Sequence, residues 1–204
     1  MASNQVNDPA RPDFWEERYR QLDIPWDLSG PAPQFVALAE GAHAPLPGRM
    51  IVLGCGRGND AIFFAGKGFD VTAVDFAPTA LQAAEQAAEA AGVKIDFLQA
   101  DMFALPQAYH HAFDYVLEHT CFAAIPPERR EEYVGVVHSL LKSDGLYIAI
   151  LFAHGRQGGP PFTTDPTEAR DLFSPRFSIE QLEITPNSVK QREGKELFGL
   201  MRPR

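Results

Sequence analysis

The chain has 204 residues, of which 45% are hydrophobic and 22% charged, and these values are typical of one globular domain with a proper core. Its formal net charge of −9 disfavours nucleic acid and anionic membrane surfaces as partners, because their phosphate groups would be repelled. The two cysteines form neither a CxxC pair nor a zinc-ligand set, and no apolar run approaches the roughly 20 residues of a membrane helix, so we expect a reduced, metal-free protein of the cytoplasm.

The N-terminal part of the chain reads as short helices joined by loops. We expect residues 1–12 to be a disordered tail, and they lack the apolar run of a signal peptide. Short helices are predicted over residues 14–22 and 34–40. The Pro- and Gly-rich stretch 24–33 between them is predicted to be a loop. Asp13 is the expected cap of the first helix, and Glu16 would complete a capping box. Residues 13–204 are expected to form a single domain that begins with this helical segment, residues 13–45.

From residue 50 onward, short apolar runs alternate with helical patterns. The runs predict strands over residues 50–53, 70–74, 94–98, 113–117, 146–152, 177–184 and 195–201. The intervening patterns predict helices between Gly58 and Gly66 and over residues 78–91, 127–142 and 167–173. This alternation predicts a Rossmann-like, doubly wound α/β/α fold with a mostly parallel sheet, and the last two strands form an antiparallel hairpin at one edge. A Gly- and Pro-rich loop over 154–167 is a candidate lid.

Three glycines at alternate positions, Gly54, Gly56 and Gly58, follow the first buried strand and open a helix. Glycine there allows a tight turn and close approach of the backbone to a ligand. Asp75 ends the next strand, where a carboxylate can accept both ribose hydroxyls of an adenosine. The alternatives are a turn without a ligand and a helix-capping role for Asp75. The GxGxG spacing weakens a dinucleotide interpretation, and no GxxxxGK[ST] sequence is present, so a P-loop is excluded.

A second acidic residue, Asp101, follows the third predicted strand. It could meet the amino group of an adenine ring or cap the turn. The adjacent Met102 and Phe103 could flank that ring or belong to the apolar core.

Several motifs resemble one family over nearly the whole chain from about Asp13. Residues 52–60 resemble motif I of class I S-adenosylmethionine (SAM)-dependent methyltransferases. Five further segments resemble the thiopurine methyltransferase superfamily, and within it the halide, thiocyanate and thiol methyltransferases: Phe14–Tyr19, Pro25–Asp27, Phe122–Ile125, Gly158–Phe162 and Arg192–Glu196. The resemblance implies methyl transfer from SAM, with S-adenosylhomocysteine (SAH) as the product, to a thiol, thiocyanate, halide or related chalcogen species. It also implies that the N-terminal helical segment, residues 13–45, covers the cofactor pocket.

The resemblance and the motifs together predict a site. The expected cofactor-binding residues are Trp26, Leu53, Gly54, Cys55, Gly56, Asp75, Phe76, Asp101, Met102, Phe103 and Glu118. The expected substrate-binding residues are Trp15, Tyr19, His119, Phe122, Phe162 and Arg192. The chain departs from the family at two places, where Ser29-Gly30 replaces a Gly-Arg pair of plant members and Glu118-His119 replaces the Asp-Arg pair of thiopurine methyltransferases.

The sulfonium methyl group of SAM is already electrophilic, so transfer mainly requires a nucleophile held about 3–3.5 Å away and in line. A charged thiolate or halide needs no base, whereas a neutral thiol benefits from one. We expect His119 and Tyr19 to be the candidate bases, and Arg192 to steer an anion or to be merely solvated. Direct transfer needs no covalent nucleophile, so Cys121 is interpreted as a small pocket or core residue.

Three other functions remain open at this level. The first is O- or N-methylation of a small metabolite, the second a catalytically silent SAM-binding module, and the third a nicotinamide-dependent oxidoreductase. The GxGxG spacing and the lack of a Tyr-x-x-x-Lys pair argue against the oxidoreductase. The partner is expected to be a small molecule, and the protein a monomer or a weak homodimer.

Overall fold

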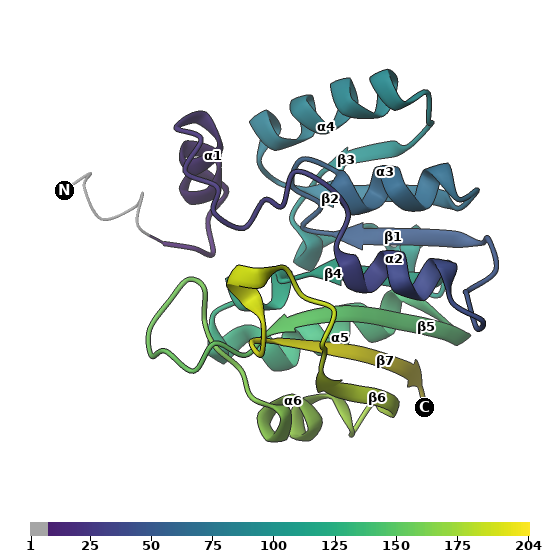
Figure 1. Cartoon of the computed structure of the whole chain (residues 1–204), viewed down its shortest axis with the longest axis vertical. Helices are drawn as coiled ribbons and strands as arrows, with labels where there is room; N and C mark the ends of the chain where they lie inside the picture. The colour runs from purple at the N-terminus through teal and green to yellow at the C-terminus, as the bar shows by residue number, and fades with distance from the viewer. Residues whose placement is uncertain (1–7) are drawn as a thin grey trace.

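The computed structural model describes residues 8–204 (Figure 1). The predicted disordered tail, residues 1–12, lies partly outside these residues and stays a prediction. Residues 8–11 form a turn in which the backbone N–H of Arg11 donates to the carbonyl of Asp8 at 3.0 Å. Helix α1 (Pro12–Arg20) begins directly after it, because the fixed φ of a proline suits the first helical position.

The predicted capping box of α1 is wrong. Asp13 lies inside the first turn, and the N-cap position is taken by Arg11 without a side-chain hydrogen bond. Glu16 bonds instead to the start of helix α4 (Pro78–Ala91), where it accepts from the backbone N–H of Thr79 at 3.0 Å and from its hydroxyl at 2.5 Å.

Seven strands form one sheet in the order β3-β2-β1-β4-β5-β7-β6. Their bounds are β1 (Arg49–Leu53), β2 (Asp70–Asp75), β3 (Asp96–Gln99), β4 (Phe113–His119), β5 (Leu141–Phe152), β6 (Phe177–Ile184) and β7 (Glu196–Pro203). The first five strands run parallel, whereas β7 is antiparallel to both β5 and β6. The predicted mostly parallel sheet with an antiparallel hairpin is confirmed, and β7 lies one position inside the edge formed by β6.

Helices cover both faces of the sheet. The remaining bounds are α2 (Pro33–Glu40), α3 (Asn59–Gly66), α5 (Arg130–Leu140) and α6 (Pro166–Phe173), with short 3₁₀ helices η1 (Met102–Ala104), η2 (Gln107–Tyr109), η3 (Cys121–Ala124), η4 (Pro127–Arg129) and η5 (Lys190–Arg192). Successive residues of β1 point to opposite faces, so Met50 and Val52 pack with α2 and α3 while Ile51 and Leu53 pack with α5 and α6. The predicted three-layer α/β/α architecture is confirmed.

The start of β5 lies well before its predicted position, and the end of β4 lies slightly beyond its own. Strand β4 continues to His119, and β5 begins at Leu141, where the sequence predicts the end of a helix. Leu141 already pairs with Phe113, and the register then shifts before Tyr115 pairs with Leu146. Buried apolar residues continue from α5 into β5, so hydrophobicity alone does not mark the change.

The carboxyl ends of β1, β2 and β4 lie side by side because Leu53 pairs with Val74 on one flank and with Glu118 on the other. The strand order reverses at this point, because β2 and β3 extend the sheet on one side of β1 and the later strands extend it on the other side. In open α/β sheets, ligands bind at such a reversal. In Figure 1, α1, the loop between β5 and α6, and η5 all lie at the edge toward which β1 and β5 point. None of the helices in residues 8–204 combines the length and apolarity needed to cross a membrane.

Candidate active site

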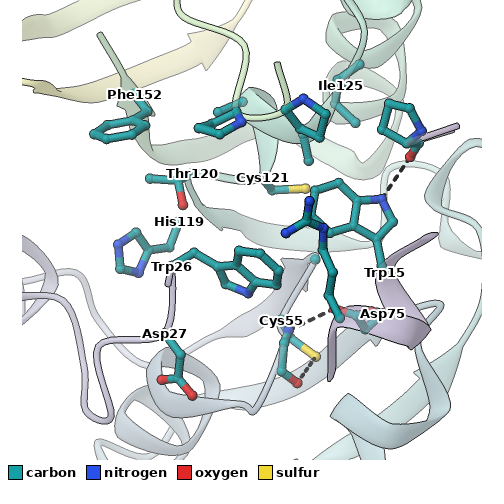
Figure 2. A pocket seen from close by; sticks show the side chains of 18 of the residues that line it. Trp15, Trp26, Asp27, Cys55, Asp75, His119, Thr120, Cys121, Ile125 and Phe152 are labelled. Carbon is teal, nitrogen blue, oxygen red and sulfur yellow. Dashed lines mark hydrogen bonds between the residues drawn. The ribbon is translucent and has the colours of Figure 1, made fainter. Parts of the chain in front are cut away.

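A pocket of about 430 Å³ opens at this edge of the sheet, within the size range of small-molecule sites. Its walls come from the turn before α1, α1 itself, the loop after it, the glycine loop, the ends of β2 and β4, η1, η3, the loop after β5, and η5. In the view of Figure 2, Phe152, Thr120 and His119 lie along one side and Cys55 and Asp75 along the other.

The glycine loop is shaped by close neighbours. Gly54 and Gly56 have φ angles of 60° and 54°, which are unfavourable for residues with a side chain. A Cβ at Gly54 would lie 2.6 Å from the sulfur of Cys121, and one at Gly56 would lie 2.8 Å from the hydroxyl of Tyr19. These glycines therefore let α1 and η3 approach the loop, in addition to leaving room for a ligand.

Asp75 is bonded to the glycine loop from the end of β2. One carboxylate oxygen accepts from the N–H of Gly56 at 2.8 Å, and the other accepts from the N–H of Ala77 at 2.9 Å. Burial raises the pKa of Asp75, although these backbone bonds oppose the shift. Each carboxylate oxygen has a second acceptor site, so the group can still receive hydroxyl donors from a ligand.

Aromatic side chains from the N-terminal cover form another wall of the pocket. The rings of Trp15 and Trp26 meet edge to face with centroids 5.5 Å apart, and those of Tyr19 and Trp26 at 5.7 Å. The indole N–H of Trp26 donates to the Tyr19 hydroxyl at 3.2 Å, and that of Trp15 donates to the carbonyl of Pro9 at 2.8 Å. Burial and the nearby Asp75 raise the pKa of Tyr19, so it stays protonated at neutral pH and is a poor general base.

His119 lines the pocket, but hydrogen bonds engage both of its ring nitrogens. Nε2 lies 3.2 Å from Nη1 of Arg192, and Nδ1 lies 2.9 Å from a carboxylate oxygen of Asp60. A guanidinium can only donate, so Nε2 accepts and Nδ1 carries the proton that is donated to Asp60. The lone pair that a general base would use is therefore occupied, which argues against the predicted catalytic role.

Arg192 is buried and paired, rather than free to steer an anion as predicted. Nη1 lies 3.1 Å from the carboxylate of Glu196, and Nη2 donates to the carbonyl of Trp26 at 2.7 Å. We call the side chains of Asp60, His119, Arg192 and Glu196 the buried polar network. It joins α3, β4, η5 and β7 to the loop that carries Trp26.

The part of the pocket beside η1 contains the remaining predicted cofactor residues that line it. Asp101, Met102 and Phe103 all line it, as does Phe76. The carboxylate of Asp101 accepts from the N–H of Phe103 at 2.9 Å and so caps η1. The guanidinium of Arg129 lies 3.6 Å from the centroid of the Phe103 ring, which presents a broad planar surface beside the pocket.

Two predicted cofactor residues, Leu53 and Glu118, do not line the pocket. Leu53 is fully buried in the core under α5 and α6, on the face to which strand alternation assigns it. Glu118 is buried below the pocket, where one oxygen accepts from the N–H of Phe122 at 2.8 Å and the other has no hydrogen-bond partner among residues 8–204. Burial raises the pKa of Glu118 to about 8. Both predictions of direct cofactor contact are corrected by this placement.

Two predicted substrate residues also lie outside the pocket lining. Phe122 is fully buried in the core, with ring centroids 5.7 Å from both Tyr133 and Phe173. Phe162 packs against its own loop, since a Cβ at Gly159 would meet the Phe162 ring at 2.5 Å. Its N–H donates to the carbonyl of Ala123 at 2.7 Å, so the backbone of Phe162 holds the loop against η3.

Sequence reasoning missed Asp27, which anchors the cover to the glycine loop. Its carboxylate accepts from the side chains of Asn59 and Arg57 at 2.7 and 3.1 Å, and from the N–H of Ser29 at 2.7 Å. Asp60, in the buried polar network, was missed in the same way. Both residues lie in segments that carry the family resemblance, but local spacing does not reveal which distant groups they bind.

Comparisons with known proteins agree with this architecture. The model of the thiopurine S-methyltransferase family matches residues 10–202. Thiocyanate methyltransferase 1 of Brassica oleracea is 31% identical over 192 residues, which cover 91% of this chain and 82% of that protein. The thiopurine S-methyltransferase of Pseudomonas paraeruginosa is 28% identical over 188 residues, covering 84% of this chain and 85% of that protein.

A solved structure with a similar fold is the 1,6-didemethyltoxoflavin-N1-methyltransferase of Burkholderia thailandensis with 1,6-didemethyltoxoflavin and SAH bound. It superposes with a TM-score of 0.77 at 22% sequence identity and covers 100% of this chain and 91% of that chain. At this identity the likeness supports the fold alone.

Proposed function

This chain belongs to the thiopurine S-methyltransferase family and is a methyltransferase, and from that premise we propose how its pocket is used. The enzyme transfers the methyl group of SAM to a small soft nucleophile, which is a thiol, thiocyanate, a halide or a related chalcogen species. Its partners are small molecules.

The position of Asp75 beside the glycine loop supports this proposal more than any other observation. The half-buried carboxylate lies at the junction of β1 and β2 and retains acceptor sites for the two ribose hydroxyls. The pocket residues beside η1 also suit an adenosine, since Asp101 offers an acceptor and Met102 and Phe103 offer apolar surface. Trp26 and Tyr19 would then cover the methionine half of the cofactor.

Bound SAM supplies a methyl group on a positively charged sulfur. The pocket residues hold the acceptor in line with that methyl and exclude water, which favours displacement. Neither the two predicted bases nor the Cys121 thiol is ready to remove a proton, because the pKa of Tyr19 is raised, the lone pair of His119 is engaged, and burial raises the pKa of Cys121. The acceptor therefore binds as an anion, which favours thiocyanate, halides and thiolates over most phenols and amines.

The test is calorimetric titration with SAH, followed by assays with labelled SAM and a panel of thiocyanate, iodide, thiols, phenols and amines. We expect Asp75→Asn to weaken SAH binding roughly 10- to 100-fold, since a hydrogen bond to a charged group contributes about 1.5–3 kcal/mol. Asp70→Asn is the matched control, because Asp70 lies exposed at the opposite end of β2. Failure of the wild-type protein to bind SAH, or equal binding by Asp75→Asn, would contradict the proposal.

The organisation around the pocket completes the proposal. Residues 13–204 form one domain, and residues 13–45 act as its cover over the cofactor. The protein works in the cytoplasm as a monomer or a weak homodimer, which sedimentation at several concentrations would distinguish.

A further inference from the structure

Five arginines line the pocket, and four of them are paired with carboxylates. The pairs are Arg18 with Asp23 at 2.7 Å, Arg57 with Asp27 at 3.1 Å, Arg129 with Glu132 at 2.9 Å and Arg192 with Glu196 at 3.1 Å. The fifth is Arg156, which has no carboxylate oxygen within 4.0 Å among residues 8–204. Among residues 8–204, Arg156 is therefore the one pocket arginine without a carboxylate partner, whereas Asp75 and Asp101 are pocket carboxylates without a cationic partner.

Arg156 lies in the loop after β5, and hydrogen bonds hold this loop without using its guanidinium. Its backbone N–H donates to Nδ1 of His154 at 3.2 Å, and Nε2 of His154 lies 3.1 Å from the carbonyl of Pro161. His154 is therefore a neutral tautomer that adds no charge, and burial lowers its pKa further. Pro160 and Pro161 of the same loop also line the pocket, so the loop is positioned as its wall.

This wall belongs to the acceptor half of the proposed site. The loop continues directly from Phe152, which lies across the pocket from Asp75 in Figure 2. With a net charge of −9, the protein as a whole repels an approaching anion. The exposed guanidinium of Arg156 opposes that repulsion locally, within about one Debye length, roughly 8–10 Å in physiological salt.

We propose that Arg156 selects acceptors that carry a negative charge when they enter the pocket. This inference rests on the proposed function and narrows its substrate class. The charge can be on the nucleophile itself, as in thiocyanate, or on a carboxylate attached to an organic thiol. In both cases the guanidinium attracts the acceptor before transfer and takes no part in breaking or forming bonds.

The test compares Arg156→Gln with Arg170→Gln. Arg170 is exposed on α6 outside the pocket, so the two variants change the net charge equally. We expect Arg156→Gln to lower kcat/KM about three- to tenfold for thiocyanate and mercaptoacetate through KM, and to lower it less for the thiolate of 2-mercaptoethanol than for mercaptoacetate, which carries a second negative charge. Added sodium sulfate should shrink the difference between Arg156→Gln and the wild type, and Arg170→Gln should follow the wild type throughout.

The acceptors distinguish the two sources of charge. A loss for both anions supports recruitment of any anionic acceptor, and a loss for mercaptoacetate alone supports the carboxylate-bearing thiol. Weaker SAH binding by Arg156→Gln would overturn the inference, because the guanidinium would then hold the cofactor's carboxylate. Equal rates for both variants on all acceptors, with normal SAH binding, would overturn it while leaving the proposed function intact. A wild-type protein that binds no SAH would overturn both.

Discussion

At the acceptor side of the pocket, His119 occupies the position of a general base, but its hydrogen bonds give it a different role. Nδ1 donates to Asp60, and Nε2 accepts from Arg192. A glutamine can make the same two bonds, one through its amide N–H and one through its oxygen. His119 is therefore a positioning residue rather than a catalytic one.

We predict that His119→Gln lowers kcat less than tenfold, whereas loss of a true general base costs about 10²–10⁴-fold. The pH profile provides a second measurement, because kcat/KM for thiocyanate should stay flat between pH 6 and 9 in the wild type and the variant. For a thiol it should rise toward the pKa of that thiol, near 8.5 for a cysteine-like group. A thousandfold loss of kcat in His119→Gln would show that His119 is a general base after all. A kcat/KM profile for thiocyanate that titrates near the pKa of histidine would show the same.

Glu118 predicts a pH dependence of stability. Burial raises its pKa from an ordinary value of 4.5 to about 8, so the folded state holds the proton more tightly than the unfolded chain. Its contribution to stability is therefore complete below about pH 4.5 and falls as the pH rises through about 8. In Glu118→Gln, the melting temperature relative to wild type should increase by at least about 2–4 °C between pH 6 and 9, equivalent to about 1 kcal/mol at this size. Parallel melting curves for the two proteins across this range would show that Glu118 does not titrate there.

The errors at residue scale share one cause. The motifs predict that four residues contact a ligand, whereas the structure places them outside the pocket lining: Leu53, Glu118, Phe122 and Phe162. Motif resemblance identifies the segment, but the direction of each side chain depends on strand alternation and on the turn that follows. Asp75 needed no such information, because it ends its strand beside a glycine loop.

At the scale of helices and strands, local signals succeeded where the chain itself terminates an element. Helix α4 has the predicted bounds because Pro78 starts it and Gly92, with a φ of 68°, ends it. The start of α1 was mispredicted, since Glu16 finds its partner 63 residues away rather than in its own helix. Capping between helices cannot be inferred from spacing along one of them.

This bond between helices predicts an effect on cofactor affinity. Glu16 satisfies the first turn of α4, and it fixes the helix that carries Trp15 and Tyr19 into the pocket. We predict that Glu16→Ala raises the Kd for SAH three- to tenfold, with a loss of about 0.5–2 kcal/mol in stability as for other helix caps. Glu17→Ala is the control, because Glu17 makes only local contacts on the same helix. Equal SAH affinity in the two variants would show that α1 is held by its apolar contacts alone.

For the whole molecule, the fold class and the mostly parallel sheet follow from alternating strands and helices, whereas the pocket depends on contacts between the two ends of the chain. Gln34 in α2 donates to Glu196 in β7 at 2.6 Å, and Ala32 donates to Asp60 at 2.7 Å. No local pattern predicts pairs separated by 162 or 28 positions. The cover is therefore attached to the domain by the buried polar network, in addition to the hydrogen bonds of Asp27 and Glu16.

That network predicts unequal costs for single and double substitutions. Arg192→Met leaves the buried carboxylate of Glu196 without its cation, and breaking a buried pair costs about 3–5 kcal/mol. Adding Glu196→Gln removes the stranded charge, so the double variant should recover at least about 1 kcal/mol in urea unfolding. SAH affinity should stay low in both variants, because neither restores the bond from Arg192 to the carbonyl of Trp26. A double variant no more stable than Arg192→Met would show that packing rather than charge dominates at this site, and wild-type SAH affinity in either variant would show that the cover closes without the network.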